Sequence, residues 1–232
     1  HLTPVVLELG GKSPVIIDES ADIQLAARRV AFGKWLNCGQ TCVAPDYVLC
    51  HESVHEKFIA ALKREIPAMY GEEPLQNEAY GKIINQKHFD RLCGLIDSTK
   101  VVFGGQTEPD CLRIAPTVMD GVSAKDAVMQ EEIFGPVLPV LTYGSLNEAI
   151  AFIESRPHPL ALYLFTSKRS VKREVKARCH FGGGCINDTI IHLATSSMPF
   201  GGVGESGMGC YHGRAGFETF CHRRSIVDKH TW

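Results

Sequence analysis

The segment NCGQTCVAPDY, residues 37–47, contains the side chain with the clearest chemical potential, the thiol of Cys42. The helical pattern before it ends at Leu36, Gly39 permits an unusual backbone turn, and Pro45 closes the loop. A cysteine on such a turn, rather than inside an apolar strand or helix, is a candidate nucleophile. The alternative is a small core residue or an inert thiol, which describes most cysteines.

Two further segments carry acids next to glycine. In LELGGKSP, residues 7–14, Glu8 ends an apolar strand and precedes two glycines, which suits a carboxylate that transfers protons. A solvated acid at a turn is the alternative. In MQEEIFGPVLP, residues 129–139, two acids precede a Phe-Gly-Pro turn that enters a strand, and the alternative is simply a loop.

The segment GGVGESGMG, residues 201–209, matches the G-x-G-x-x-G fingerprint of a dinucleotide-binding turn, and Asp228 stands about where its ribose-binding acid would be. The fingerprint requires a strand before it and a helix after it. The preceding ATSSMPFG is no buried strand, and Gly209, Gly213 and Gly216 are too many glycines for a stable helix. We interpret the segment as a glycine-rich loop packed against other backbone.

A zinc-protease pattern, H-E-x-x-H, occurs at HESVH, residues 51–55. That pattern needs both histidines on one face of a helix. Here His51 directly follows a predicted strand, and Ser53 suits a helix start better than a helix interior. The sequence therefore predicts polar residues at a surface helix start and no metal site.

Apolar runs alternate with amphipathic helical patterns, which predicts an α/β fold whose strands are covered on both faces. Glycine-rich residues 182–216 are expected to form long ordered loops. Helices are predicted at 22–36, through Phe58, Leu62 and Ile66, near Phe89 to Ile96, at 145–153 behind a capping box, and at 171–178. Strands are predicted at 5–9, 14–18, 46–50, 100–105, 137–143 and 160–165.

Composition excludes several classes of protein. The 232 residues carry a net charge of -2, so the composition shows no excess of positive charge for binding nucleic acid or an anionic membrane. No apolar run approaches the length of a transmembrane helix, so no membrane span is expected. Nine cysteines, an odd and irregularly spaced set, favour reduced thiols in a cytoplasmic protein over a disulfide framework.

Taken together, LELGGKSP, GQTC and EEIFGPVLP resemble the aldehyde dehydrogenase superfamily in sequence, order and spacing. PFGGVGESGMGCYHG and FETFCHRR are similar to its class 3 branch, and the resemblance extends to about Arg224. It implies an aldehyde dehydrogenase-like catalytic domain with a doubly wound sheet. It also implies that most of the amino-terminal Rossmann-type cofactor domain is absent from these residues.

The resemblance implies roles for the two reactive side chains. Cys42 matches the family nucleophile, whose thiolate attacks the aldehyde carbon while its backbone N–H holds part of the oxyanion. Glu8 matches the base that activates water to hydrolyse the resulting thioester. The chemistry is expected to need an ionised, reachable sulfur that faces the carboxyl group across a gap one water molecule wide.

The same resemblance implies a cofactor, NAD or NADP, and a substrate pocket. Glu132 matches the acid that holds the nicotinamide ribose, Phe134 the ring beside the nicotinamide, and Gly10 a further cofactor-binding position. The aldehyde pocket is expected to be formed by Phe32, Phe200 and His212. Their size suits a medium- or long-chain or aromatic aldehyde.

Three parts are expected in the chain: the end of the cofactor-binding domain at 1–12, the catalytic domain at 13–200, and a glycine-rich and carboxy-terminal segment at 201–232 at a domain junction or dimer interface. A complete protein is expected to be a homodimer, with peripheral membrane association left open. The chain alone is expected to be inactive. The alternative is a non-enzymatic remnant that acts as a binding or dimerisation module.

Overall fold

A seven-stranded sheet forms the centre of the protein, whose computed structural model describes residues 2–231. All neighbouring strands are parallel except β4 and β7, which are antiparallel. The expected α/β fold with a mostly parallel sheet is confirmed. In spatial order the strands are β10 (Gly183–Ile186), β9 (Ala161–Phe165), β2 (Pro14–Ile17), β3 (Tyr47–His51), β8 (Val137–Tyr143), β7 (Thr117–Met119) and β4 (Val101–Phe103).

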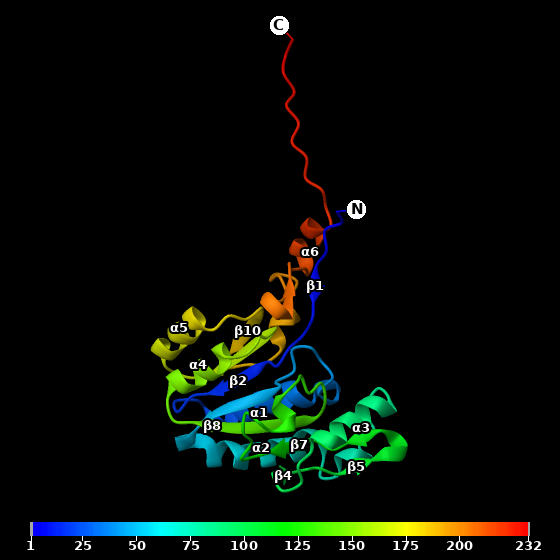
Figure 1. The fold of residues 1–232 in the computed structure, drawn as a ribbon, viewed down its shortest axis with the longest axis vertical. Helices are drawn as coiled ribbons and strands as arrows, with labels where there is room; N and C mark the ends of the chain where they lie inside the picture. The colour runs from blue at the N-terminus through cyan, green and yellow to red at the C-terminus, as the bar shows by residue number, and fades with distance from the viewer. Residues whose placement is uncertain (1, 232) are drawn as a thin grey trace.

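Helices cover both sides of this sheet, as right-handed crossovers between parallel strands require. Helix α1 (Ile23–Trp35) follows β2 and packs against α2 (His55–Tyr70), which follows β3. Helices α4 (Leu146–Glu154) and α5 (Arg169–Arg178) lead from β8 to β9 and from β9 to β10, in the opposite direction across the sheet. Figure 1 shows α4 and α5 on one side of β2 and β8, and α2 on the other. Helix α3 (Gln86–Leu95) lies to the right of α2 in the same view.

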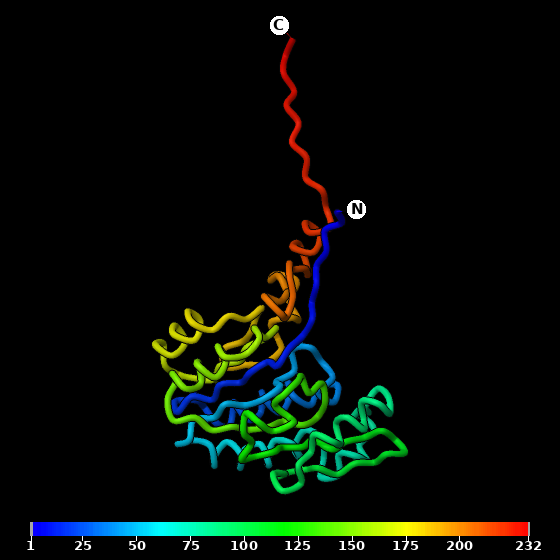
Figure 2. The backbone as a smooth tube through the Cα atoms, viewed as in Figure 1, coloured from blue at the N-terminus to red at the C-terminus, as the bar shows by residue number. Residues whose placement is uncertain are grey.

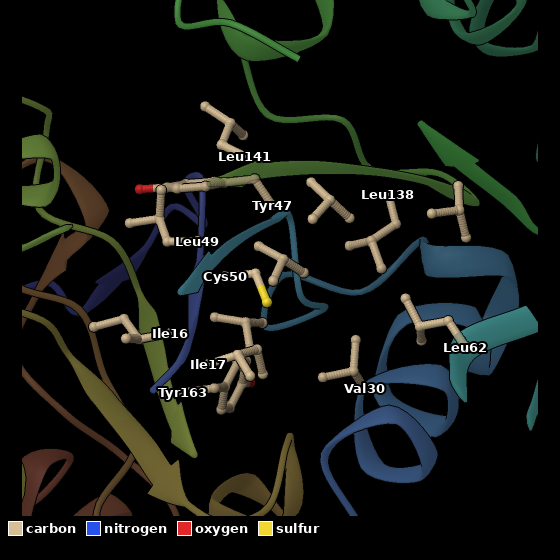
Figure 3. Close-up of a cluster of buried hydrophobic side chains, with 14 of the residues drawn as sticks. Ile16, Ile17, Val30, Tyr47, Leu49, Cys50, Leu62, Leu138, Leu141 and Tyr163 are labelled. Atoms are coloured by element: carbon tan, nitrogen blue, oxygen red, sulfur yellow. The ribbon is translucent and has the colours of Figure 1, made fainter. Parts of the chain in front are cut away.

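The central strands are apolar because they are buried on both faces. Every residue of β2 and β9 is buried, and β8 exposes only Thr142. Burying one such side chain stabilises the fold by about 1.5–3 kcal/mol. Figure 3 shows side chains of three strands meeting those of two helices: Ile16, Ile17, Leu49 and Leu138 lie in one cluster with Val30 of α1 and Leu62 of α2.

The glycine-rich residues 182–216 differ from the prediction, because besides loops they contain short strands and the start of a helix. Strand β10 pairs in parallel with β9, and a Cβ on its Gly184 would lie 2.0 Å from the Leu162 carbonyl oxygen. Glycine is therefore required there by close approach of backbone. Helix α6 (Gly213–Thr219) forms despite its two glycines. The expectation of long ordered loops is wrong at these positions.

Both ends of the chain lead away from the sheet, as the tube in Figure 2 shows. There β1 (Leu7–Glu8) pairs antiparallel with β11 (Gly207–Met208), so only two of the expected residues 5–9 form a strand. The predicted domain limits at residues 12 and 200 stay a prediction. Elsewhere a small hairpin joins β5 (Thr107–Glu108) to β6 (Arg113–Ile114). None of the helices formed by residues 2–231 is both long and apolar enough to cross a bilayer.

A buried carboxylate ties β2 to β9 at their carboxyl ends. Asp18, only 5% exposed, accepts hydrogen bonds from Ser20 Oγ at 2.5 Å and Thr166 Oγ1 at 2.9 Å. Burial raises its pKa, but these hydrogen bonds outweigh burial and lower the pKa below its ordinary value. A lowered pKa means that the carboxylate stabilises the fold above about pH 4 and that this contribution is lost as pH falls.

We therefore expect Asp18→Ala to lower the free energy of unfolding at pH 7 by about 1–3 kcal/mol, because the buried hydroxyl of Thr166 and the half-buried hydroxyl of Ser20 lose their acceptor. Chemical denaturation followed by circular dichroism at pH 7 and pH 3 measures this loss, which should shrink at the lower pH. Asp97→Ala is the control, since Asp97 makes a similar turn with Thr99 at the surface. Equal losses in the two variants at both pH values would contradict the role given to Asp18.

Candidate active site

The three segments singled out in the sequence meet at the edge of the sheet where the parallel strands begin. Glu8 precedes β2, Cys42 precedes β3 and Glu132 precedes β8, and these strands are neighbours in that order. Since adjacent parallel strands start at one edge, the side chains before them gather there. Open α/β sheets commonly bind ligands at the carboxyl edge instead. This protein places its candidate chemistry at the amino edge.

Cys42 and Glu8 are in direct contact. Both side chains are half-buried, and the Glu8 carboxyl group is within hydrogen-bonding reach of the Cys42 thiol. Burial, then the charge and hydrogen bond of Glu8, then the charge of Glu132, raise the pKa of Cys42 to about 12. A raised pKa favours the protonated thiol, with a carboxylate beside it. The ionised sulfur and the one-water gap expected from the sequence stay predictions.

The backbone on both sides of Cys42 holds it in place. Asn37, Cys38 and Gly39 have φ values of 51°, 54° and 71°, a left-handed turn that costs roughly 1–2 kcal/mol for each residue with a side chain. A Cβ on Gly39 would lie 2.2 Å from the Gly135 carbonyl oxygen, so glycine is needed there. The backbone N–H of Cys42 lies close to its own sulfur, where it favours the thiolate and places a donor beside the reacting atom.

Glu132 lies against the glycines that follow Glu8. A Cβ on Gly10, whose φ is +77°, would lie 2.9 Å from Glu132 Oε2, and the backbone N–H of Gly11 donates to the carboxylate. Burial and the charge of Asp46 nevertheless raise the pKa of Glu132 to about 7. The predicted cofactor positions Gly10 and Glu132 are thus brought together by the fold.

An ion pair fixes the loop that carries Glu132. Lys12 Nζ lies 2.5 Å from Asp46 Oδ2 and donates to the carbonyl oxygens of Val128 at 3.0 Å and Glu131 at 2.9 Å. The other Asp46 oxygen accepts the backbone N–H of Ile133 at 2.8 Å. These four contacts leave the loop little freedom on either side of Glu132.

Phe134 lies on the same loop, in a left-handed conformation with φ of 50° and with its side chain 42% exposed. Arg91 donates to the carbonyl oxygens of Glu132 and Ile133, and Trp35 Nε1 donates to that of Pro136 at 2.8 Å. The ring is therefore held at the surface by a rigid backbone, as a ring that contacts a ligand would be.

Two of the three predicted pocket residues lie together. Phe200 is buried and stacks on the His212 ring, with centroids 5.1 Å apart and planes 21° apart. Phe32 lies on α1 with 41% of its surface exposed, and no ring contact joins it to that pair within the described part of the chain. The structure thus brings Phe200 and His212 together, and the place of Phe32 in the pocket stays a prediction.

Sequence reasoning missed Tyr211, which packs edge-on against His212 with centroids 4.8 Å apart. Its backbone exchanges two hydrogen bonds of 2.8 Å with Phe200. Burial, then the charges of Glu8 and Cys42, raise the pKa of Tyr211, which places its hydroxyl in the field of both groups. Its position directly before His212 was the only signal in the sequence.

The two histidines of the H-E-x-x-H pattern contact different residues. His51 Nδ1 lies 2.7 Å from Ser53 Oγ, whereas His55 Nε2 lies 2.8 Å from Asp120 Oδ1, so the two rings have different partners. Among residues 2–231 no three or more His, Cys, Asp or Glu side chains are grouped as a metal site would need.

The glycines of GGVGESGMG are explained by close backbone contacts. A Cβ on Gly202 would lie 2.1 Å from the Ser206 carbonyl oxygen, and a Cβ on Gly207 would lie 2.2 Å from that of Leu7. A 3-10 turn and β11 follow the first of these glycines, in place of the helix that a dinucleotide-binding unit requires. The interpretation as a glycine-rich loop packed on other backbone is confirmed.

Fold and site together define an aldehyde dehydrogenase module, and the chain belongs to the aldehyde dehydrogenase family, whose model matches residues 1–226. Among its relatives, the 4,4'-diaponeurosporen-aldehyde dehydrogenase of Staphylococcus aureus is 53% identical, over 100% of this chain and 51% of the relative. The dimeric NADP-preferring aldehyde dehydrogenase of Rattus norvegicus is 51% identical, over 99% of this chain and 51% of the relative.

Comparison with solved structures leads to the same family. The substrate-bound state of Staphylococcus aureus AldH matches with a TM-score of 0.98 and 52% identity, covering 99% of this chain and 51% of that one. The chain therefore spans about half the length of the relatives it matches. The resemblance stated from the sequence is confirmed, and so is the aldehyde dehydrogenase-like fold.

Proposed function

We propose that this chain supplies the nucleophile, the base and part of the cofactor site of an NAD(P)-dependent aldehyde dehydrogenase that oxidises aldehydes to carboxylic acids. The observation that carries the proposal is the contact between Cys42 and Glu8, with Glu132 close enough to act on the same thiol. A nucleophile within reach of a base is the arrangement that covalent catalysis requires.

In the first half of the reaction, Cys42 Sγ attacks the aldehyde carbon. Its pKa of about 12 means that the proton must leave as the bond forms, and the touching Glu8 carboxylate is placed to accept it. The oxygen of the resulting thiohemiacetal gains negative charge beside the backbone N–H of Cys42, which stabilises it. Glu8 then passes the proton to solvent and is again a base.

The residues at the amino edge fit a nicotinamide cofactor. The Glu132 carboxylate can accept both hydroxyls of a ribose, and Gly10 leaves the space beside it free of a side chain. Both line a cavity of about 470 Å³ that also includes Leu9 and Lys12. Phe134 offers an exposed ring beside it on the same loop. When bound, NAD(P)+ supplies the acceptor for the hydride that leaves the thiohemiacetal carbon.

In the second half, the acyl group is held on Cys42 as a thioester. Glu8 removes a proton from water, the hydroxide adds to the thioester carbon, and the acid leaves as Cys42 regains its thiol. Because sulfur is a good leaving group, the thioester is readily hydrolysed. The nearby carboxylate activates the water that attacks it.

The substrate proposed is a medium- or long-chain or aromatic aldehyde. The stacked rings of Phe200 and His212, with Tyr211 against them, give the site an apolar wall. The name of the staphylococcal relative, which gives 4,4'-diaponeurosporen-aldehyde, supports the choice of an aldehyde. We propose a homodimer for the complete protein, as the name of the rat relative suggests.

The chain alone is expected to show no aldehyde-dependent formation of NADH or NADPH, because it matches only half of its relatives. Joining it to the remaining half of the staphylococcal relative gives what we call the completed enzyme, in which we expect turnover. Absorbance at the wavelength of the reduced nicotinamide measures turnover by the chain alone and by the completed enzyme. Turnover by the chain alone would contradict the expectation, and a folded but inactive completed enzyme would favour a binding or dimerisation remnant.

A further inference from the structure

The nucleophile turn has a second set of contacts that the reaction does not use directly. Three successive residues, Asn37, Cys38 and Gly39, are left-handed, and Gly39 alone lacks a side chain. A single non-glycine residue in this conformation is uncommon, and two in succession persist only where the surroundings hold them. The question is which groups hold them four residues before the reactive thiol.

Gln40 is the first anchor. Its side-chain Nε2 donates to the carbonyl oxygens of Asn37 at 3.2 Å and Lys82 at 3.0 Å, and its Oε1 accepts the backbone N–H of Ile84 at 3.0 Å. Asn37 Nδ2 donates in return to the Gln40 carbonyl oxygen at 3.0 Å. One amide group thus closes the turn and fastens it to residues 82–84.

Cys38 is the second anchor. It is 2% exposed, and its sulfur lies near Gly81, where a Cβ would approach it to 3.2 Å. The thiol also makes hydrogen-bonding contacts with the Tyr80 side chain and the Gly81 backbone, while Tyr80 itself donates to the Ile114 carbonyl oxygen at 2.9 Å. Both anchors therefore end on the same segment, residues 80–84, which carries no group of the candidate site.

We propose that Cys38 and Gln40 are positioning residues for Cys42: by bonding to residues 80–84 they hold the left-handed turn that presents the thiol to Glu8. This inference rests on the proposed function, because it concerns the proposed nucleophile. It predicts that losing an anchor lets the turn relax and moves the thiol out of its half-buried place beside Glu8.

The rate of alkylation of Cys42 by iodoacetamide tests this in the chain as it stands, without any dehydrogenase activity. The groups that face the thiol are Glu8, Glu132 and Tyr211, with Tyr163 from β9 also in its field. Because burial and Glu8 raise the pKa of Cys42 to about 12, a thiol released from both should react faster at pH 8. Peptide mass spectrometry separates Cys42 from the other cysteines.

We expect Gln40→Ala and Cys38→Ala to raise the rate of alkylation of Cys42 at least about fivefold over that of the parent, at each pH between 7 and 9. The rates at Cys93 and Cys185 should stay unchanged. Gln40→Glu, which keeps only the acceptor for Ile84, should fall between the parent and Gln40→Ala and guards against failure of the latter to fold. Gln76→Ala is the matched control, since Gln76 bonds to Glu108 away from the site. Rates at Cys42 within about twofold of the parent, in folded variants, would overturn the proposal whether or not the completed enzyme is active.

Discussion

Cys42→Ser is expected to lower kcat of the completed enzyme by about a thousandfold or more. Serine is close in size to cysteine, so the half-buried position should keep its packing. Its hydroxyl is a much weaker nucleophile, and an oxygen ester would be hydrolysed less readily than the thioester. Steady-state kinetics with a medium-chain aldehyde measure the effect, together with the Kd of the cofactor, which should stay near that of the parent.

Cys111→Ser is the control for this variant. Cys111 is an exposed free thiol in the loop between β5 and β6, on the part of the chain that carries no site residue. Its replacement should leave kcat unchanged. Activity of Cys42→Ser comparable to that of Cys111→Ser would show that another group is the nucleophile.

Glu8→Gln is the variant with the second largest expected effect. Removing the base from contact with Cys42 should lower kcat by about 10²–10⁴, since both proton transfers assigned to Glu8 are lost. The amide keeps the size of the side chain and the pairing of Glu8 with Gly207 in the β1–β11 ladder. Stopped-flow measurements should show slower hydride transfer, followed by still slower release of the acid.

The exposed residue Glu78 provides the comparison, because Glu78→Gln removes one carboxylate that is no part of the candidate site and should leave the kinetics unchanged. If Glu8→Gln retained the full rate of acid release, the base would have to be sought elsewhere. If it lost binding of the cofactor instead, Glu8 would be acting on Glu132, whose pKa its charge also raises.

The fold was predictable where burial alone decides the structure. Residues of β2, β8 and β9 are apolar because the sheet is covered on both faces, and their runs are long enough to stand out. Strand β10 was not predictable, since its first two residues are glycines that show no hydrophobic pattern. Gly184 is a glycine because β9 approaches closely, and that neighbour is known only from the folded chain.

The residues of the site that belong to sequence motifs were predictable. Cys42, Glu8 and Glu132 were identified in the sequence, and the strand order explains why they meet. The state of the thiol was not predictable, because it depends on burial and on direct contact with Glu8. The role of Gln40 was not predictable either, because two of its partners, Lys82 and Ile84, lie more than 40 residues along the chain and belong to no motif.

The most direct test of the account is to look for the acyl group on the sulfur. Completed enzyme carrying Glu8→Gln would be mixed with aldehyde and NAD(P)+, quenched in acid, digested and analysed by mass spectrometry. We predict an acyl adduct on the peptide that contains Cys42 and on no other cysteine, absent when the cofactor is left out. An adduct on a different residue, or sustained formation of the acid by an enzyme whose Cys42 is never acylated, would contradict covalent catalysis by this thiol.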